Sequence, residues 1–191
     1  MNRAHPDLSL VRPAISVAGA ILCCAAAVTA YGEARPAAPT AKSFLGDRAV
    51  RIIKDATKVE VFRIKPMKEP KPAGEVIGGY TVLSAGRDQG PDFARRLASV
   101  LLDDKTYAFD RAKGCIFSPG VGFRLWKGKE SVEVITCFQC DEFSILAKDA
   151  RGETIRQVGE DFDNARPALV KLAKDAFPDD KEIQGLNDRG N

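Results

Sequence analysis

Residues 121–140 read VGFRLWKGKESVEVITCFQC and carry the clearest structural signal of the chain. Two runs that alternate apolar and polar side chains flank the dipeptide Gly128–Lys129. A glycine at the first central position favours a two-residue type II′ turn, which joins antiparallel strands. With that turn Phe123 lies opposite Val134, and one face of the hairpin is apolar along its whole length. The sequence therefore predicts a β-hairpin in a fixed register.

Helical and extended segments are both predicted outside this hairpin. Apolar residues at a spacing of three and four indicate amphipathic helices, and alternating runs indicate further strands. The predicted helices cover 45–53, 91–101 and 162–176, and the predicted strands cover 58–64 and 76–86. Helices and strands do not alternate regularly, as they would around a parallel sheet. We therefore expect an α+β fold, with an antiparallel sheet that contains the 121–140 hairpin and packs against about three amphipathic helices.

The first 42 residues differ in composition from the rest of the chain. Arg3 and Arg12 precede an uncharged run over 13–32. The small residues that a signal peptidase recognises lie within this run and end at Ala30. This pattern predicts a signal peptide over 1–30, with an N-terminal membrane anchor as the alternative. The Ala/Pro-rich residues 31–42 are expected to form a flexible tether, and residues 43–191 a single α+β domain.

Either alternative for residues 1–30 predicts an exported protein. The domain would be periplasmic or extracellular, and it would be anchored to a membrane only if the N-terminal segment is retained.

Cleavage near Ala30 would remove His5, the only histidine, and two of the five cysteines. Histidine is the usual general base near neutral pH and the commonest metal ligand. Its loss excludes Ser-His-Asp and Cys-His nucleophilic machinery in their usual forms. Without Arg3, Arg12 and Asp7 the net charge of +3 becomes about +2, which gives no argument for a nucleic-acid partner. The sequence predicts no cofactor.

The predicted mature chain keeps Cys115, Cys137 and Cys140. Side chains alternate along a strand, so Cys137 and Cys140 are predicted to point to opposite faces, with Cys115 on the face of Cys140. The preferred interpretation is structural: buried thiols, or a Cys115–Cys140 disulfide that leaves Cys137 free. The alternatives are a redox-active C-x-x-C motif and a three-thiolate metal site, for which Asp141 is the nearest fourth ligand.

Arg124 and Trp126 share the polar side of the predicted hairpin, where Arg124 faces Glu133. Trp126 is the only tryptophan of the chain. The two residues are candidates for surface recognition. The preferred interpretation packs Trp126 under a helix instead, because tryptophan is highly buried on average.

Two segments carry a resemblance to other proteins. They are KGCIFSPGVGFRLWKGKESVEVITCFQC and FDNARPALVKLAKDAFPDDKEI, with C-x-F-x-P and C-F-x-C elements in the first. Over Tyr107–Ile183 the chain resembles a family of small exported bacterial proteins with no assigned activity. The resemblance implies a folded domain in the cell envelope, and it carries over no catalytic or binding residue.

Two classes of function follow from the sequence. The first is an exported cell-envelope domain that acts as a non-catalytic interaction or structural module and binds an unknown protein or envelope component. The second is a thiol–disulfide redox or metal–thiolate protein that uses Cys115, Cys137 and Cys140. The chain has no recognisable general base, phosphate-binding loop or nucleophile arrangement, so the first class is favoured over an enzyme.

Overall fold

The computed structural model describes residues 38–111 and 113–189, which all belong to one compact unit. The predictions of a signal peptide or anchor, and of a tether as far as residue 37, lie outside these residues. Within the described ranges the domain starts at Thr40, which caps the first helix ahead of the buried Ala41. No helix in this part of the chain is long and apolar enough to cross a membrane.

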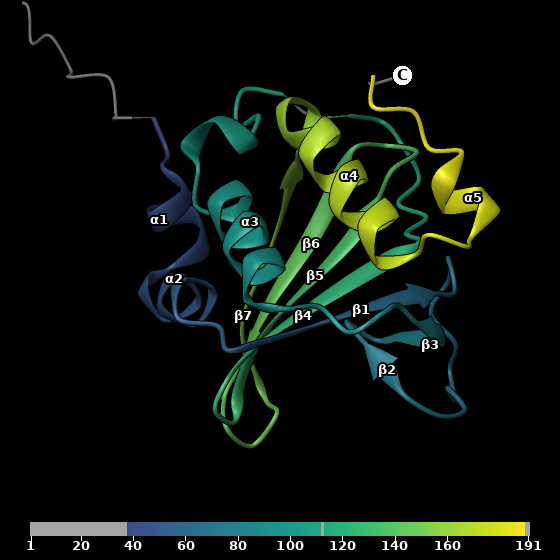
Figure 1. Cartoon of the computed structure of the whole chain (residues 1–191). Coiled ribbons are helices and arrows are strands. Elements are labelled where there is room, and N and C mark those ends of the chain that lie inside the picture. Colours follow the sequence, from purple (N-terminus) through teal and green to yellow (C-terminus); the bar gives the residue numbers. More distant parts are fainter. Residues whose placement is uncertain (1–37, 112, 190–191) are drawn as a thin grey trace, which may run out of the picture. The chain divides into compact units, whose positions relative to one another are not determined.

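Seven strands form one antiparallel sheet in the order β2-β3-β1-β4-β5-β6-β7 (Figure 1). Their bounds are β1 Lys58–Ile64, β2 Val76–Ile77, β3 Tyr80–Ala85, β4 Val121–Lys127, β5 Glu130–Cys137, β6 Glu142–Lys148 and β7 Thr154–Asp161. The α+β class and the antiparallel sheet are confirmed. The strands β6 and β7 were not predicted, and they complete a meander that begins with β4.

The central hairpin has the predicted register, with Phe123 opposite Val134 and Arg124 opposite Glu133. Gly128 adopts a φ of +60°, whereas Lys129 keeps a negative φ, as a type II′ turn requires. The alternating side chains therefore divide β4 and β5 into an apolar face and a polar face, as the sequence pattern predicts.

Five α-helices are described, so the prediction of about three is wrong in number. Their bounds are α1 Ala41–Leu45, α2 Asp47–Lys54, α3 Pro91–Leu101, α4 Arg166–Ala176 and α5 Lys181–Gln184. Gly46 has a φ of +81°, a value outside the helical region, and this residue divides the first predicted helix into α1 and α2. Asp180 accepts hydrogen bonds from two backbone N–H groups and starts α5 as an additional turn.

The main core lies between one face of the sheet and the helices α1 to α4 (Figure 1). Apolar side chains of the central strands and of α3 and α4 meet there without solvent exposure. Examples are Leu97, Phe123, Val134 and Leu169. We refer to the opposite face of the sheet as the helix-free face.

A second, smaller core lies on the helix-free face, where the β2–β3 hairpin folds over the sheet. The stretch predicted as one strand over 76–86 is this hairpin, because Gly78 and Gly79 have φ values of +58° and +85° and reverse the chain. A Cβ atom on Gly78 would lie 2.4 Å from Cγ1 of Ile135. The backbone at Gly78 therefore packs too closely against β5 for a side chain, and the prediction of one continuous strand over 76–86 is wrong.

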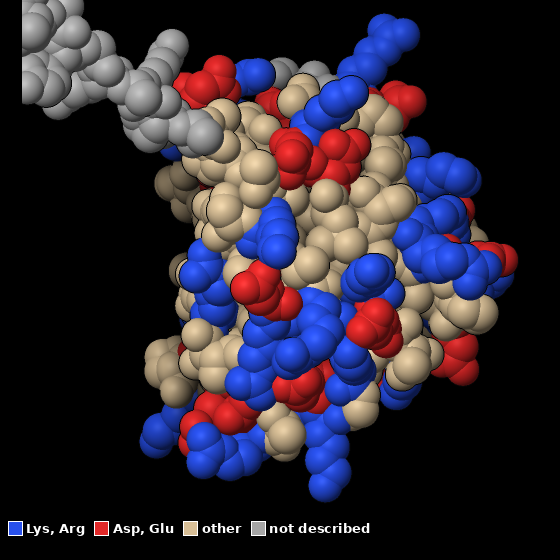
Figure 2. All heavy atoms as spheres, turned by 90° about the vertical axis from the view of Figure 1, so that its left-hand side faces the viewer, with Lys and Arg blue, Asp and Glu red and all other residues tan. Residues whose placement is uncertain are grey.

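Charged side chains interleave on the surface that carries α1 and α2. Figure 2 shows Lys and Arg side chains gathered in its lower half, with Asp and Glu between them. The lower half of this surface corresponds to the lower part of the molecule in Figure 1, which holds α2, the β4–β5 turn and the β6–β7 turn.

Candidate functional site

The candidate cysteines lie around the turn that joins β5 to β6, residues 138–141. Asp141 ends this turn with a φ of +56°, a left-handed conformation that aspartate tolerates better than most residues. Its carbonyl oxygen accepts a hydrogen bond of 2.7 Å from the backbone N–H of Phe162. The chain therefore reverses tightly here, next to the end of β7.

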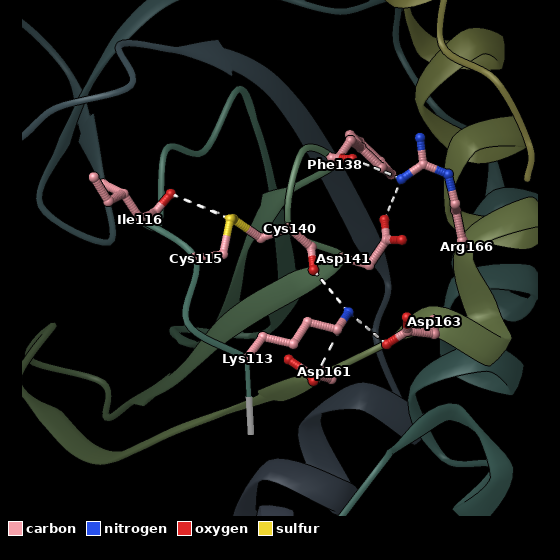
Figure 3. Close-up of a disulfide and its surroundings, with 9 residues drawn as sticks. All are labelled: Lys113, Cys115, Ile116, Phe138, Cys140, Asp141, Asp161, Asp163 and Arg166. Carbon is pink, nitrogen blue, oxygen red and sulfur yellow. Dashed lines mark hydrogen bonds and ion pairs between the residues drawn. A yellow bond between two sulfur atoms is a disulfide. The ribbon is translucent and has the colours of Figure 1, made fainter. Parts of the chain in front are cut away.

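A disulfide joins Cys140 in this turn to Cys115 in the loop before β4 (Figure 3). The two Cα atoms are 5.9 Å apart, within the range that a disulfide spans. The carbonyl oxygen of Ile116 lies 3.3 Å from Sγ of Cys140. Cys140 is buried and Cys115 is exposed, so one end of the bond is accessible to solvent. The predicted Cys115–Cys140 pairing is confirmed.

Lys113 reinforces the same connection. Its Nζ donates hydrogen bonds to the carbonyl oxygen of Cys140 at 2.8 Å and to Oδ2 of Asp163 at 2.7 Å. The same Nζ lies 3.8 Å from Oδ2 of Asp161, which is too far for a hydrogen bond. Oδ2 of Asp161 is buried and has no hydrogen-bond partner among the described residues. Lys113 thus ties the loop before β4 to the turn and to the start of the segment after β7.

Two carboxyl groups near Lys113 have raised pKa values. Burial raises the pKa of Asp161, and the nearby charge of Asp163 adds to the effect. Glu142 lies directly across the β6–β7 ladder from Asp161. Burial is also the main cause of its raised pKa, and the charge of Asp161 is the second. Both groups therefore bind protons more readily in the folded chain than in the unfolded one.

A buried ion pair also stabilises the β5–β6 turn. Arg166, at the start of α4, and Asp141 have side chains that are only 3% and 5% exposed, and Nη1 of Arg166 donates to Oδ1 of Asp141 (Figure 3). The same Nη1 donates to the carbonyl oxygen of Phe138 at 2.6 Å, and Nε donates to that of Asn187 at 3.1 Å. Arg166 therefore links the turn to the C-terminal segment. The disulfide, Lys113 and this ion pair together form what we call the turn clamp.

Cys137 takes no part in the turn clamp. Its thiol is free and its side chain has no solvent exposure. It pairs with Glu142 in the β5–β6 ladder. The two cysteines of the C-x-x-C motif are thus in different states. Cys140 is bonded to Cys115, outside the motif, and Cys137 is a free buried thiol. The residues 38–111 and 113–189 contain no group of three or more His, Cys, Asp or Glu side chains that could hold a metal ion.

Trp126 and Arg124 lie on the helix-free face, so the expectation that Trp126 packs under a helix is wrong. The indole Nε1 of Trp126 donates to Oε2 of Glu60 at 2.8 Å. The guanidinium of Arg124 lies 5.8 Å from the centroid of the indole ring and 5.1 Å from that of Phe62. The tryptophan is held in place by charged groups, and part of its surface remains exposed.

Arg124 is the centre of a buried polar network. It donates to Glu133 at 3.0 Å and to Glu75 at 2.5 Å. Glu133, 2% exposed, also accepts from the backbone N–H of Gly78 at 2.8 Å and pairs with Lys148 at 2.8 Å. These contacts attach the β2–β3 hairpin to the central strands. Arg124 therefore has a structural role in the sheet.

Two hollows accompany these sites. One, of about 690 Å³, lies next to the turn clamp, and its wall includes Phe138, Gln139 and Arg166. Leu83 also lines it and is 56% exposed, at a point where β3 has one extra residue relative to β1. The other hollow, of about 550 Å³, is lined by Trp126 and Arg124. Both volumes fall within the range of roughly 300–1,000 Å³ that is typical of ligand sites.

Sequence reasoning missed Lys113, Asp161 and Arg166. The partners of Lys113 and Arg166 in the turn are 27 and 25 residues away in the chain. No local pattern distinguishes Lys113 and Asp161 from exposed charged residues. The signal that could have found Arg166 is its position among apolar residues at the start of a predicted helix.

No protein-family model, curated protein or solved structure matches this chain. The resemblance over Tyr107–Ile183 therefore stays a prediction.

Proposed function

We propose that this chain is an exported cell-envelope domain that works as a non-catalytic interaction module. The observation that carries the proposal is the arrangement of the three sulfur atoms. Cys140 is bonded to Cys115, while Cys137 is free and enclosed in the sheet. The cysteines then serve to stabilise the domain rather than to turn over a substrate.

Reactive thiols are partly exposed and sit beside positive charge or a helix N-terminus, where the thiolate is stabilised. Cys137 has no solvent exposure and belongs to a strand. A dithiol enzyme of the C-x-x-C type also needs its two sulfurs to bond to each other during turnover, whereas Cys140 has Cys115 as its partner. These features favour a structural disulfide over a redox centre.

Export is supported by the same bond. Disulfides persist in oxidising compartments and are rare in the cytosol, where thiols are kept reduced. A structural disulfide with one exposed cysteine is therefore suited to the periplasm or the cell exterior. The partner in this proposal is a protein or another envelope component.

The test uses the full chain, expressed in a bacterium and purified from the envelope fraction in its processed form. Insulin reduction and metal content are measured for the wild type and for Cys137→Ser and Cys140→Ser. We expect no cysteine-dependent turnover and no retained metal. Catalytic insulin reduction that is lost in either variant would contradict the proposal. A metal-to-protein ratio near one, lost in the same variants, would contradict it as well.

A further inference from the structure

The hollow that contains Trp126 lies on the helix-free face, at the end of the sheet where β4 turns into β5 and β6 turns into β7. Trp126 and Ser131 are directly paired across the β4–β5 ladder, and Lys148 is paired with Ser131 in the next strand. These three side chains form one row across the sheet. The remaining walls come from the two turns, with Gly128, Lys129 and residues 149–152.

The charge of this hollow is positive. Its lining contains four cationic and two acidic side chains, which are Arg124, Lys129, Lys148 and Arg151 against Glu133 and Asp149. Lys129 is exposed, and within the described part of the chain it makes no ion pair. Lys148 has one ion-pair partner, so two of its three N–H groups remain for another acceptor.

The two acidic side chains are already committed to structural contacts. Glu133 is 2% exposed and is shared between Arg124 and Lys148. Oδ1 of Asp149 accepts from the backbone N–H groups of Arg151 and Glu153 at 2.9 and 3.0 Å, which fixes the β6–β7 turn. The hydrogen bonds to this turn hold the pKa of Asp149 below its ordinary value despite partial burial. Arg124 and Arg151 are in turn paired with carboxylates. The cationic groups that remain for a ligand are therefore the ammonium group of Lys129 and the two remaining N–H groups of Lys148.

Trp126 supplies an aromatic surface of fixed orientation. Its Nε1 is held by Glu60 and its ring lies near the Arg124 guanidinium, so little side-chain freedom remains to be lost on binding. An indole ring offers a large contact area for the apolar face of a ligand ring. The hydroxyl group of Ser131 lies between this ring and Lys148 in the row described above. Ser131 is only 3% exposed, so the groups that the row presents to a ligand are the indole ring and the ammonium group of Lys148.

We propose that this hollow binds an acidic saccharide, with a sugar ring against Trp126 and an anionic group beside Lys129 and Lys148. The proposal rests on the proposed binding function, because it names the class of envelope component that the module recognises. A simple inorganic anion would use the lysines but would gain nothing from the indole ring. A neutral sugar would use the ring but not the charge.

The chain contains one tryptophan, so its fluorescence reports on this hollow alone. The envelope-purified protein is titrated with trigalacturonate, with neutral maltotriose and with inorganic phosphate. We expect a saturable change in emission with trigalacturonate, weakened by added salt, and at least about ten-fold weaker binding of the other two probes. Comparable binding of maltotriose or phosphate would overturn the proposal, as would an unchanged emission with trigalacturonate.

Lys129→Glu and Lys105→Glu form a matched pair of variants. Both lysines are exposed, and in the described ranges neither side chain makes an ion pair, but Lys105 lies in the short helix before Tyr107 and not in the hollow. We expect Lys129→Glu to weaken trigalacturonate binding by about ten-fold and Lys105→Glu to leave it unchanged. Equal effects of the two variants would overturn the proposal. This failure would leave the insulin and metal measurements unaffected, so the two proposals fail separately.

Discussion

Removal of the disulfide should cost a predictable part of the stability of the domain. Replacing both Cys115 and Cys140 with alanine opens a covalent loop whose ends are 25 residues apart. The chain-entropy relation for a loop of this length gives about 3.5 kcal/mol at room temperature, because the unfolded chain gains conformational freedom. Alanine is used because Cys140 is 5% exposed and a serine hydroxyl would add a desolvation cost.

The assay is equilibrium unfolding in urea, followed by the fluorescence of the single tryptophan. Oxidised wild type and the double variant are compared at neutral pH. Cys137→Ala is the matched control, because it removes a buried sulfur and leaves the loop closed. We expect this control to lose roughly 1 kcal/mol, as for deletion of one buried group. Wild type in a strong reductant should approach the double variant.

A small loss of stability would contradict a stabilising role of the disulfide. If the double variant loses less than about 1 kcal/mol, or no more than Cys137→Ala, loop closure by the disulfide does not contribute to stability as the chain-entropy relation requires. A wild type that is unaffected by reductant would refute it in the same way.

Three further outcomes are expected from unfolding measurements. Arg166→Ala should lower the free energy of unfolding by about 3–5 kcal/mol, because it leaves Asp141 charged and buried without its partner; a loss under about 1 kcal/mol would contradict this. Asp161→Asn should be more stable than wild type at neutral pH. Folding raises the pKa of Asp161, so ionisation of this carboxyl lowers the free energy of unfolding as the pH rises above its ordinary pKa of 3.8. The advantage of the variant should therefore vanish at acidic pH. A pH-independent difference would argue against the assignment. Gly78→Ala should lower the free energy of unfolding by about 2–5 kcal/mol, because of backbone strain and overlap with the sheet. Gly152→Ala should lower it by about 1–3 kcal/mol, because Gly152 has a positive φ but open space around it. Equal losses would show that the β2–β3 hairpin does not pack closely on the sheet.

The central hairpin could be predicted because its pattern is local. Alternation over β4 and β5 and the glycine at position 128 fix both the turn and the register, and the face assignment follows. The same face assignment placed Cys140 with Cys115 and apart from Cys137. The sequence pattern does not say whether a helix also covers the polar face of the hairpin. For this reason the prediction that Trp126 packs under a helix was wrong.

Other features depend on contacts between distant segments. The turn at Gly78 and Gly79 was not predicted, because the close approach of Gly78 to Ile135 joins segments that are far apart in the chain. The helix break at Gly46 depends on the positive φ of this one residue, which the apolar spacing over 45–53 does not reveal. Lys113 and Arg166 find their partners far along the chain, so the sequence does not identify these ion pairs even where the position of Arg166 in the helix pattern indicates burial.

The bonding state of Cys115, Cys137 and Cys140 distinguishes a structural disulfide from a redox centre. The full chain is expressed in a bacterium and purified without reductant. It is then alkylated under native conditions and again in urea, and its disulfides are mapped by peptide mass spectrometry. The account predicts a Cys115–Cys140 cross-link in both samples and alkylation of Cys137 only after unfolding, because its side chain has no solvent exposure. A Cys137–Cys140 cross-link, or rapid alkylation of Cys137 in the native protein, would contradict it.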